Sequence, residues 1–344
     1  MNSTEQPDNG GHVPDPSAGN PETAVTIDRA GENESPTAYR ERGRSLLQPG
    51  KLRPPDKVVV IYLATVAFLI LASYDRVRLW WLLVPAHGLA IVLIFLLGRL
   101  DSIHSIQGWR AKTLSIARSW YPLILIPITY KELGYLIPLI HPHDFDRELA
   151  LIDQRILGVD PIMWLDRINY PAVTLIMQLA YLTYYVMPIV LGVVLWRSGR
   201  FADFEFFLFM VLLGFYTSYL GYIAVPAIGP RFFLSPGAAR SLGGPGVTAI
   251  RSFLDRMEGT TRDCFPSGHT ELTLLVLYCA YRFHRKTFFI LLPAGSALIV
   301  STVYLRYHYV VDVIAGAICA VALALAGDWL YRAAGGVSVA RRNV

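Results

Sequence analysis

Long apolar stretches separated by short polar segments form the main pattern of this chain. Most are near the length of about 20 residues that an α-helix needs to cross a bilayer. Eight stretches have this character: residues 58–74, 79–98, 116–140, 172–196, 204–228, 269–283, 287–305 and 309–331. The pattern predicts an all-α fold, a polytopic membrane bundle of about eight transmembrane helices, of which the sixth and seventh are short.

The flanking segments divide the chain into four parts. Residues 1–56 are rich in Pro, Gly, Glu, Ser and Asn and nearly lack aromatic residues. Such a composition buries too little apolar surface to offset the entropy of ordering, so we expect a disordered cytosolic tail. Residues 57–114 are expected to form two accessory transmembrane helices, residues 115–332 a six-helix core, and residues 333–344 a cytosolic C-terminal tail.

Composition agrees with a membrane protein and excludes other classes. The 344 residues are 53% hydrophobic and 17% charged, and the net charge of +5 includes no dense Lys/Arg block, so a nucleic-acid partner is not indicated. Three cysteines are too few for a disulfide framework. Cys279 and Cys319 lie in apolar runs and are expected to pack as small hydrophobic residues. Cys264 precedes a polar motif and could have a chemical role, although a structural role is favoured.

Basic residues indicate an orientation. With the N-terminus inside, every cytoplasmic segment carries Lys or Arg, as the positive-inside rule expects. Both termini are then cytoplasmic in a multi-pass protein of the cell membrane. The long outer loop 229–268 breaks the rule, because it carries five arginines that would attract anions: Arg231, Arg240, Arg251, Arg256 and Arg262.

A second outer segment, residues 141–170, contains an amphipathic stretch. Leu149, Ile152 and Ile156 are expected on one helical face, opposite Asp153 and Arg155. A helix that lies in the membrane interface fits this pattern, and a short soluble helix packed on the loops fits it nearly as well.

The strongest chemical signal lies at the start of the last apolar run. His308 and Asp312 are four residues apart, a spacing that places them on one helical face. A carboxylate there can keep one imidazole nitrogen protonated and leave the other as a nucleophile. Attack on phosphorus would give a phosphohistidine.

A second motif opens the sixth apolar run. Ser267 and Gly268 precede His269, and free backbone N–H groups at a helix start bind phosphate oxygens. His269 can protonate a leaving alkoxide and later deprotonate the incoming alcohol or water. Span counting puts this motif and the His308 motif at the same, extracytoplasmic side of the membrane.

Arginine matches the geometry of phosphoryl oxygens, and Arg231 and Arg306 lie close to these motifs in the sequence. A single histidine at a membrane edge is more often structural. The joint arrangement of two histidines, an aspartate and arginines on one side favours a catalytic site.

Two other features allow alternative interpretations. Lys131 and Glu132 lie inside the third run, where a charge pair can contact a headgroup or form a structural ion pair. Tyr181, Tyr184 and Tyr185 form a stripe in the fourth run, and packing is the favoured interpretation of that stripe.

These motifs resemble those of the type 2 phosphatidic acid phosphatase superfamily. The Pro-Ser-Gly-His element is intact, whereas Thr302 stands where that family has Arg and Pro230-Arg231 reverses its Arg-Pro order. The stretches 229–233 and 304–309 are similar to the inositol phosphorylceramide synthase branch, the aureobasidin-resistance type. Residues 132–135 and 153–161 are similar to the bacterial members of that branch.

The resemblance implies a set of roles. His308 would be the nucleophile, Asp312 its partner, His269 the general acid and base, and Arg231 a phosphate ligand; we expect Arg306 to replace the missing Arg. The resemblance also implies no metal and no cofactor.

Three functions are compatible with these residues. The first is a phosphotransferase that moves a phospho-headgroup, by resemblance phosphoinositol, from a phospholipid to a lipid alcohol. The second is a phosphatase of the same architecture that uses water to cleave phosphatidic acid or a polyprenyl phosphate or diphosphate. The third is a non-catalytic lipid-binding membrane protein, which the presence of His269, His308 and Asp312 disfavours.

Overall fold

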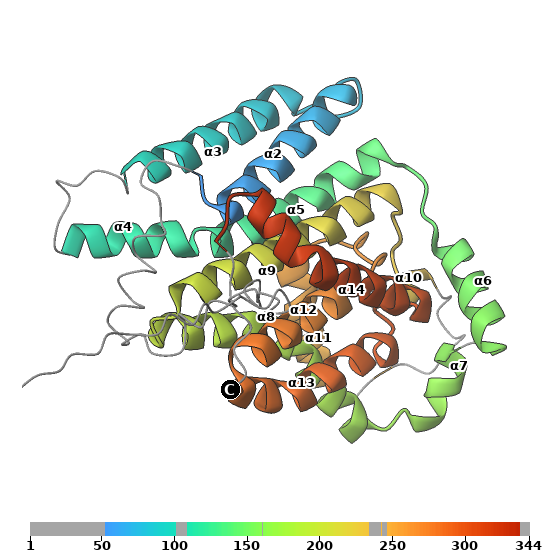
Figure 1. Ribbon diagram of the computed structural model, residues 1–344. Coiled ribbons are helices and arrows are strands. Elements are labelled where there is room, and N and C mark those ends of the chain that lie inside the picture. The colour runs from blue at the N-terminus through green and yellow to red at the C-terminus, as the bar shows by residue number, and fades with distance from the viewer. Residues whose placement is uncertain (1–51, 101–108, 160, 234–241, 243–245, 338–344) are drawn as a thin grey trace, which may run out of the picture. The chain divides into compact units, whose positions relative to one another are not determined.

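The computed structural model describes residues 52–100, 109–159, 161–233, 242 and 246–337 (Figure 1). The predicted N-terminal tail lies outside the described residues except for residues 52–56. There the prediction of disorder was wrong, because a helix begins at Pro54 and Asp56 is buried among polar partners. The helices are α2 (Pro54–Ala72), α3 (Trp80–Leu100), α4 (Trp109–Trp120), α5 (Pro122–Ile140), α6 (Asp146–Leu157), α7 (Pro161–Leu165), the 3-10 helix η1 (Asp166–Ile168), α8 (Pro171–Arg197), α9 (Phe201–Ala224), α10 (Pro230–Phe233), α11 (Val247–Glu258), α12 (Gly268–Phe283), α13 (Arg285–Tyr304) and α14 (Val310–Ala333).

The all-α prediction is confirmed, because the described residues form helices and no strand. Seven helical segments are long and apolar enough to cross a membrane: Pro54–Ala72, Trp80–Leu100, Thr113–Ile140, Pro171–Arg197, Phe201–Ala224, Arg285–Tyr304 and Val310–Ala333. The sixth predicted span corresponds to α12, which has 16 residues and falls short of that length. The chain is thus a multi-pass membrane protein whose helix bounds agree with the apolar runs to within a few residues.

Helix α9 forms the centre of the bundle. It packs against α2, α5, α8, α12 and α14, and it is the most buried of the seven candidate spans (Figure 1). Its sequence is apolar on every side, which is the pattern of a helix enclosed by other helices. Its end near Ala224 lies beside the segments that carry the histidines.

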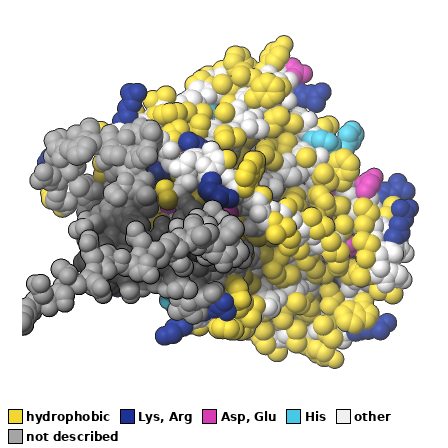
Figure 2. Space-filling model, in the orientation of Figure 1, with side chains coloured by type: hydrophobic (Ala, Val, Ile, Leu, Met, Phe, Trp, Pro, Cys, Tyr) yellow, Lys and Arg dark blue, Asp and Glu magenta, His cyan; other side chains and the backbone are white. Residues whose placement is uncertain are grey.

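The outer helices expose their apolar side chains. Phe68, Leu89, Ile124, Ile290 and Leu325 are each more than half exposed. Figure 2 shows a face on which hydrophobic side chains form a broad, nearly continuous surface. In water such a surface would drive aggregation, whereas a bilayer solvates it, so the surface agrees with the assignment of the spans.

Two glycines let the helices of the histidine motifs approach closely. A Cβ atom at Gly316 of α14 would overlap the carbonyl oxygen of Ser267, and one at Gly268 would overlap the hydroxyl of Tyr222. Residues with side chains would push α12 away from α14 or α9. The crossing of α12 and α14 therefore depends on backbone-to-backbone contact.

One detail of the amphipathic stretch differs from the sequence prediction. A helix does form there, α6, but Asp153 is buried on the same side as Leu149, while Ile152 and Ile156 are exposed. Residues four apart share a helical face, so placing Asp153 opposite Leu149 was wrong. The structure gives Asp153 a polar partner inside the fold, described below.

Candidate active site

The two histidine motifs meet where α12 and α14 begin. Ser267 caps α12, because its hydroxyl oxygen accepts the N–H of Thr270, and its own N–H donates to the carbonyl of Asp312 at 3.0 Å. His308 lies just before α14, in a turn closed by hydrogen bonds from the N–H groups of Tyr307 and His308 to the carbonyl of Thr302. These caps fix the backbone on both sides of the site.

The imidazole rings of His269 and His308 are in direct contact. His269 Nδ1 lies 3.0 Å from His308 Nε2, and both side chains are more than 90% buried. His308 Nδ1 is 2.8 Å from the carbonyl oxygen of Cys264, an acceptor only, so Nδ1 carries the proton. The lone pair of His308 is therefore on Nε2, the nitrogen that faces His269.

Asp312 lies behind His308, as the spacing predicted, but at a longer distance than a hydrogen bond. Its Oδ2 atom is 3.6 Å from His308 Nδ1 and accepts the N–H of Tyr309 at 2.7 Å and the thiol of Cys264 at 2.9 Å. The carbonyl of Cys264 thus takes the hydrogen bond that was expected for Asp312. The carboxylate instead supplies negative charge close to the imidazole.

Cys264 takes part in this cluster as a hydrogen-bond donor. Burial, and then the charge of Asp312, raise the pKa of its thiol well above the usual range, so the thiol keeps its proton. The ligand atoms of Cys264, His308 and Asp312 lie within 4.8 Å of one another, close enough to hold a metal ion. A metal would have to displace the thiol proton and the His308–Cys264 hydrogen bond, so a hydrogen-bonded cluster fits these residues better.

A polar cavity opens beside the histidines. Arg231, Asp255 and Asp263 line it together with His269 and His308. Arg231 Nη2 contacts both carboxylate oxygens of Asp255, at 2.6 and 2.5 Å. The predicted phosphate ligand Arg231 therefore does lie with the histidines, and a phosphate would compete with Asp255 for it.

A second arginine near this cavity is one that sequence reasoning did not single out. Desolvation, followed by the positive charge of Arg231, lowers the pKa of Arg251 in α11. The positive charges of Arg231 and Arg251 therefore act on each other, and together they would attract an anion to this part of the loop. The sequence signal was only that both belong to the arginine-rich loop.

Arg306 is not brought into the cavity. It adopts a left-handed backbone conformation, with φ of 66°, and its side chain forms an ion pair with Asp166 of η1. This pair ties the turn before His308 to the segment after α7. The structure thus gives Arg306 a partner far from the position expected for the missing family arginine.

Ser267 and Gly268 lie beneath the histidines and do not line the polar cavity. The Ser267 side chain is fully buried and is occupied in capping α12. Both residues therefore act on the position of His269 through the backbone in this structure, and their predicted contact with phosphate remains a prediction.

The tyrosine stripe of α8 packs as expected, but its partner is the active site. The ring of Tyr181 lies 4.6 Å from His269 and 4.5 Å from Tyr307, and the ring of Tyr184 lies 4.2 Å from His269. Both tyrosine rings thus pack against the His269 imidazole. Helical spacing alone gave no reason to expect a histidine against them.

Lys131 and Glu132, the charged pair of the third apolar run, lie in two different environments. Glu132 lies 3.4 Å from Nε2 of His87 on α3, an ion pair if that histidine is protonated. Its neighbour Lys131 points into an apolar cavity that also reaches His269. One residue thus joins the accessory helices to the core, and the other faces the site.

Two aspartates of α6 brace the loops of the site. Asp153 accepts the N–H groups of Val310 and Val311, both at 2.7 Å, and so caps α14. Asp146 accepts the N–H groups of Ile228 and Gly229, both at 2.8 Å, just before Arg231. Sequence reasoning missed both roles, because the bonds join segments about 80 and 160 residues apart.

Comparison with known proteins agrees with this geometry. Residues 147–326, 180 of the 344, match the family described as the PAP2 superfamily. The chain belongs to the PAP2 superfamily. The matched PAP2 segment contains Asp153, Arg231, His269, His308 and Asp312, so the whole cluster described above lies within it.

A curated relative supports the same family. A PA-phosphatase related-family protein of Dictyostelium discoideum is 27% identical over 163 residues, which cover 41% of this chain and 30% of that protein. The chain thus spans about a third of the length of that relative. No solved structure matches the chain.

Proposed function

We propose that this chain is a membrane phosphotransferase that cleaves a phospholipid headgroup ester through phospho-His308 and passes the phospho-headgroup to a lipid alcohol. The observation that carries the proposal is the tautomer of His308. Its Nδ1–H is held by the Cys264 carbonyl, so the Nε2 lone pair faces the cavity side shared with His269.

In the first step the substrate phosphate enters the polar cavity and displaces the His269–His308 hydrogen bond. Nε2 of His308 attacks phosphorus, and the P–O bond to the diacylglycerol oxygen breaks, so the phospho-headgroup stays on His308. His269, protonated for this step, gives its proton to the leaving alkoxide oxygen. The positive charge that forms on the His308 ring is stabilised by Asp312 at 3.6 Å.

In the second step the acceptor alcohol enters beside the phosphoenzyme. Its hydroxyl proton passes to His269, its oxygen attacks phosphorus, and the P–N bond to His308 breaks. Both histidines return to their starting states, so the cycle balances. Arg231, which lines the polar cavity, is the cation that would stabilise the charge of the phosphoryl oxygens, and Arg251 would add positive charge nearby.

The identity of the donor lipid is proposed from the family resemblance, and the side of the membrane on which the site lies is proposed from the basic residues of the loops. The similarity of residues 229–233 and 304–309 to the inositol phosphorylceramide synthase branch supports phosphatidylinositol as the donor. The basic residues of the loops support cytoplasmic termini and an extracytoplasmic site in the cell membrane.

A phosphatase is the second candidate, since water can replace the alcohol in the second step. The printed name of the Dictyostelium relative, a PA-phosphatase related-family protein, supports this alternative. The donor would then be phosphatidic acid or a polyprenyl phosphate.

Product analysis separates the two candidates. Purified protein in detergent receives headgroup-labelled phosphatidylinositol or phosphatidic acid, with and without ceramide or diacylglycerol. Label on a new lipid only when the alcohol is present supports a transferase, and free phosphate or inositol phosphate regardless of alcohol supports a phosphatase. Acid-labile, base-stable label on the wild type but not on the His308→Ala variant would support the phosphohistidine; its absence with active enzyme would contradict it.

A further inference from the structure

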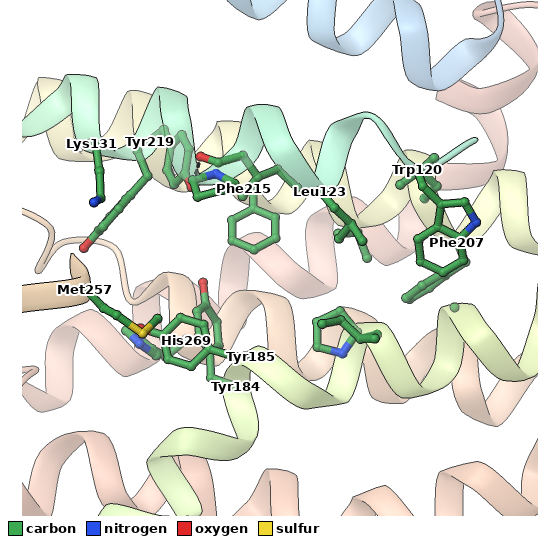
Figure 3. Close-up of a pocket in the computed structure, with 18 of the residues that line it drawn as sticks. Trp120, Leu123, Lys131, Tyr184, Tyr185, Phe207, Phe215, Tyr219, Met257 and His269 are labelled. Atoms are coloured by element: carbon green, nitrogen blue, oxygen red, sulfur yellow. Dashed lines mark hydrogen bonds between the residues drawn. The ribbon is translucent and has the colours of Figure 1, made fainter. Parts of the chain in front are cut away.

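A second, apolar cavity runs from the histidines along three helices (Figure 3). Side chains of α5, α8 and α9 line it, and His269 and Asp263 belong to its lining as well as to that of the polar cavity. The two cavities therefore meet at the reacting groups. A ligand bound in the polar cavity therefore lies next to the apolar groove, with His269 and Asp263 at the boundary.

The lining residues follow one face of each helix. On α8 they recur at intervals of three to four residues from Tyr184 to Gly192, and on α9 from Phe204 to Tyr222. Eighteen positions of α9 correspond to about 27 Å of helix. The groove is thus long enough to hold an extended hydrocarbon chain.

The groove has a polar end and an apolar end. Lys131 and Asp263, the charged side chains of its lining, belong to the end near His269, and Figure 3 shows Lys131 there and Trp120 with Phe207 at the other end. At that far end the Trp120 and Phe204 rings lie 5.0 Å apart. The groove therefore changes from polar to apolar along its length, as a lipid phosphate does from its headgroup to the end of its chain.

The groove also has a route to the bilayer. Helices α5 and α8 each pack on α9, which forms the floor, while packing between α5 and α8 themselves is slight in the described part of the chain. Leu123 on α5 and Ile189 on α8 line the groove and are 40% and 45% exposed. A hydrocarbon chain could enter sideways between these two helices without crossing a polar surface.

We propose that this groove binds one hydrocarbon chain of the lipid phosphate donor and that Trp120, with Gly192 opposite it, sets the length of chain that fits. The proposal rests on the proposed function, because it takes the donor phosphate to lie at His308. A Cβ atom at Gly192 would lie 3.3 Å from the Trp120 ring and 3.5 Å from Phe204 and Phe207. A larger side chain there fills the far end.

A chain-length series tests the measuring role. Turnover of octanoyl, myristoyl and stearoyl lysophosphatidylinositol with ceramide, and of the same series of lysophosphatidic acids, is measured for the Gly192→Leu and Trp120→Ala variants, and the series that the wild type turns over is compared. Gly192→Leu is expected to lower kcat/KM for the stearoyl substrate by about tenfold and to leave the octanoyl substrate within about twofold, because only the long chain reaches the obstruction. Trp120→Ala is expected to shift the preference towards the longer chain.

Matched controls exist on other helices. Gly88→Leu adds the same side chain where nothing lies within 4 Å, and Trp329→Ala removes a Trp that is 65% exposed and does not line the groove. Neither should change the ratio between substrates. Equal losses on all chain lengths for Gly192→Leu, or the same ratios in variants and controls, would overturn the measuring role.

Binding without turnover separates this proposal from the proposed function. In a Cys319→Ser background, the thiols of the Ile189→Cys and Leu123→Cys variants are labelled with a lipid-soluble maleimide. Stearoyl lysophosphatidic acid should slow their labelling at least about fivefold, and should not protect the thiols of Ile176→Cys and Ile124→Cys, whose native side chains are exposed outside the groove.

The outcomes are distinct. Protection without turnover of any lipid phosphate would leave the groove as a lipid site and contradict the proposed function. Turnover without protection at positions 189 and 123 would overturn the groove while the function stands.

Discussion

Two buried polar clusters lie at opposite ends of α14, and they are built differently. Near its C-terminal end, Asp56 accepts hydrogen bonds at both carboxylate oxygens, from Arg53, Arg118 and Tyr121. At its start, His269 Nε2 and Asp312 Oδ1 have no hydrogen-bond partner within the described structure.

This difference indicates that the Asp56 cluster has a structural role and the His308 cluster a catalytic one. A buried cluster whose acceptors are all satisfied loses stability when one partner is removed, and it cannot accept a ligand without losing bonds. A cluster with open acceptors beside a cavity costs stability and is ready for substrate. The Asp56 cluster is therefore expected to govern stability, and the His308 cluster to govern activity.

The sharpest test of the comparison is His308→Ala. Loss of the nucleophile should lower kcat by about a thousandfold or more, with a small effect on thermal unfolding. His269→Ala should behave similarly, by a factor of about a hundred to ten thousand. Turnover and melting temperature in detergent check both, and near-normal turnover in either variant would contradict the mechanism.

Asp56→Ala should show the reverse pattern. It leaves two buried arginines without their carboxylate, which costs about 3–5 kcal/mol of stability. Turnover per folded molecule should stay close to that of the wild type. Denaturant unfolding and active-site titration check this; a specific loss of kcat in a stable Asp56→Ala protein would show that the two ends are not independent.

Asp153 tests whether α6 positions the site. Asp153→Ala removes the cap from two N–H groups of α14 and should cost about 1–2 kcal/mol. Because α14 carries Asp312 and follows His308, kcat should fall roughly ten- to a hundredfold while KM changes little. Asp153→Asn keeps one acceptor and should be intermediate. A loss of stability without any change in kcat would make Asp153 purely structural.

The polar cavity should respond to pH through Asp263. Burial raises the pKa of this carboxyl group, so it takes up a proton at a higher pH than a free aspartate does. As pH falls through that raised pKa, a negative charge leaves the cavity and an anionic phosphate should bind more tightly. KM measured against pH checks this, and Asp263→Asn, which has no charge to lose, should flatten the dependence.

The smallest effect is expected at Cys264. Its S–H donates to Asp312, whereas its backbone carbonyl, which holds His308, survives any substitution. Cys264→Ser should retain most activity and Cys264→Ala should lose several-fold. The raised pKa and burial also predict that iodoacetamide labels Cys264 only after unfolding, which mass spectrometry can follow.

Sequence patterns predicted correctly those features that depend on neighbouring residues in the chain. Apolar runs predicted the helices, because bilayer thickness fixes their length, and the four-residue spacing of His308 and Asp312 predicted a shared face. Span counting predicted only that the two histidine motifs lie on the same side of the membrane; their direct contact comes from the structure.

Other features depend on contacts between distant segments. The carbonyl of Cys264 replaces Asp312 as the acceptor for His308, and Arg306 pairs with Asp166 instead of facing the cavity. Nothing in the spacing of these residues encodes such pairings, since a backbone acceptor has no sequence signature. The hydrogen bonds of Asp146 and Asp153 to distant backbone N–H groups could not be predicted for the same reason.

The close crossing of α12 and α14 has a consequence for how this protein can change. The side chains of the apolar groove can be exchanged singly for others of similar character, so chain preference can drift in small steps. At Gly316 the neighbour is the backbone of Ser267, which no compensating substitution can shorten. During evolution the substrate range can therefore change gradually, while the distance between the two histidines stays nearly constant in every variant that folds.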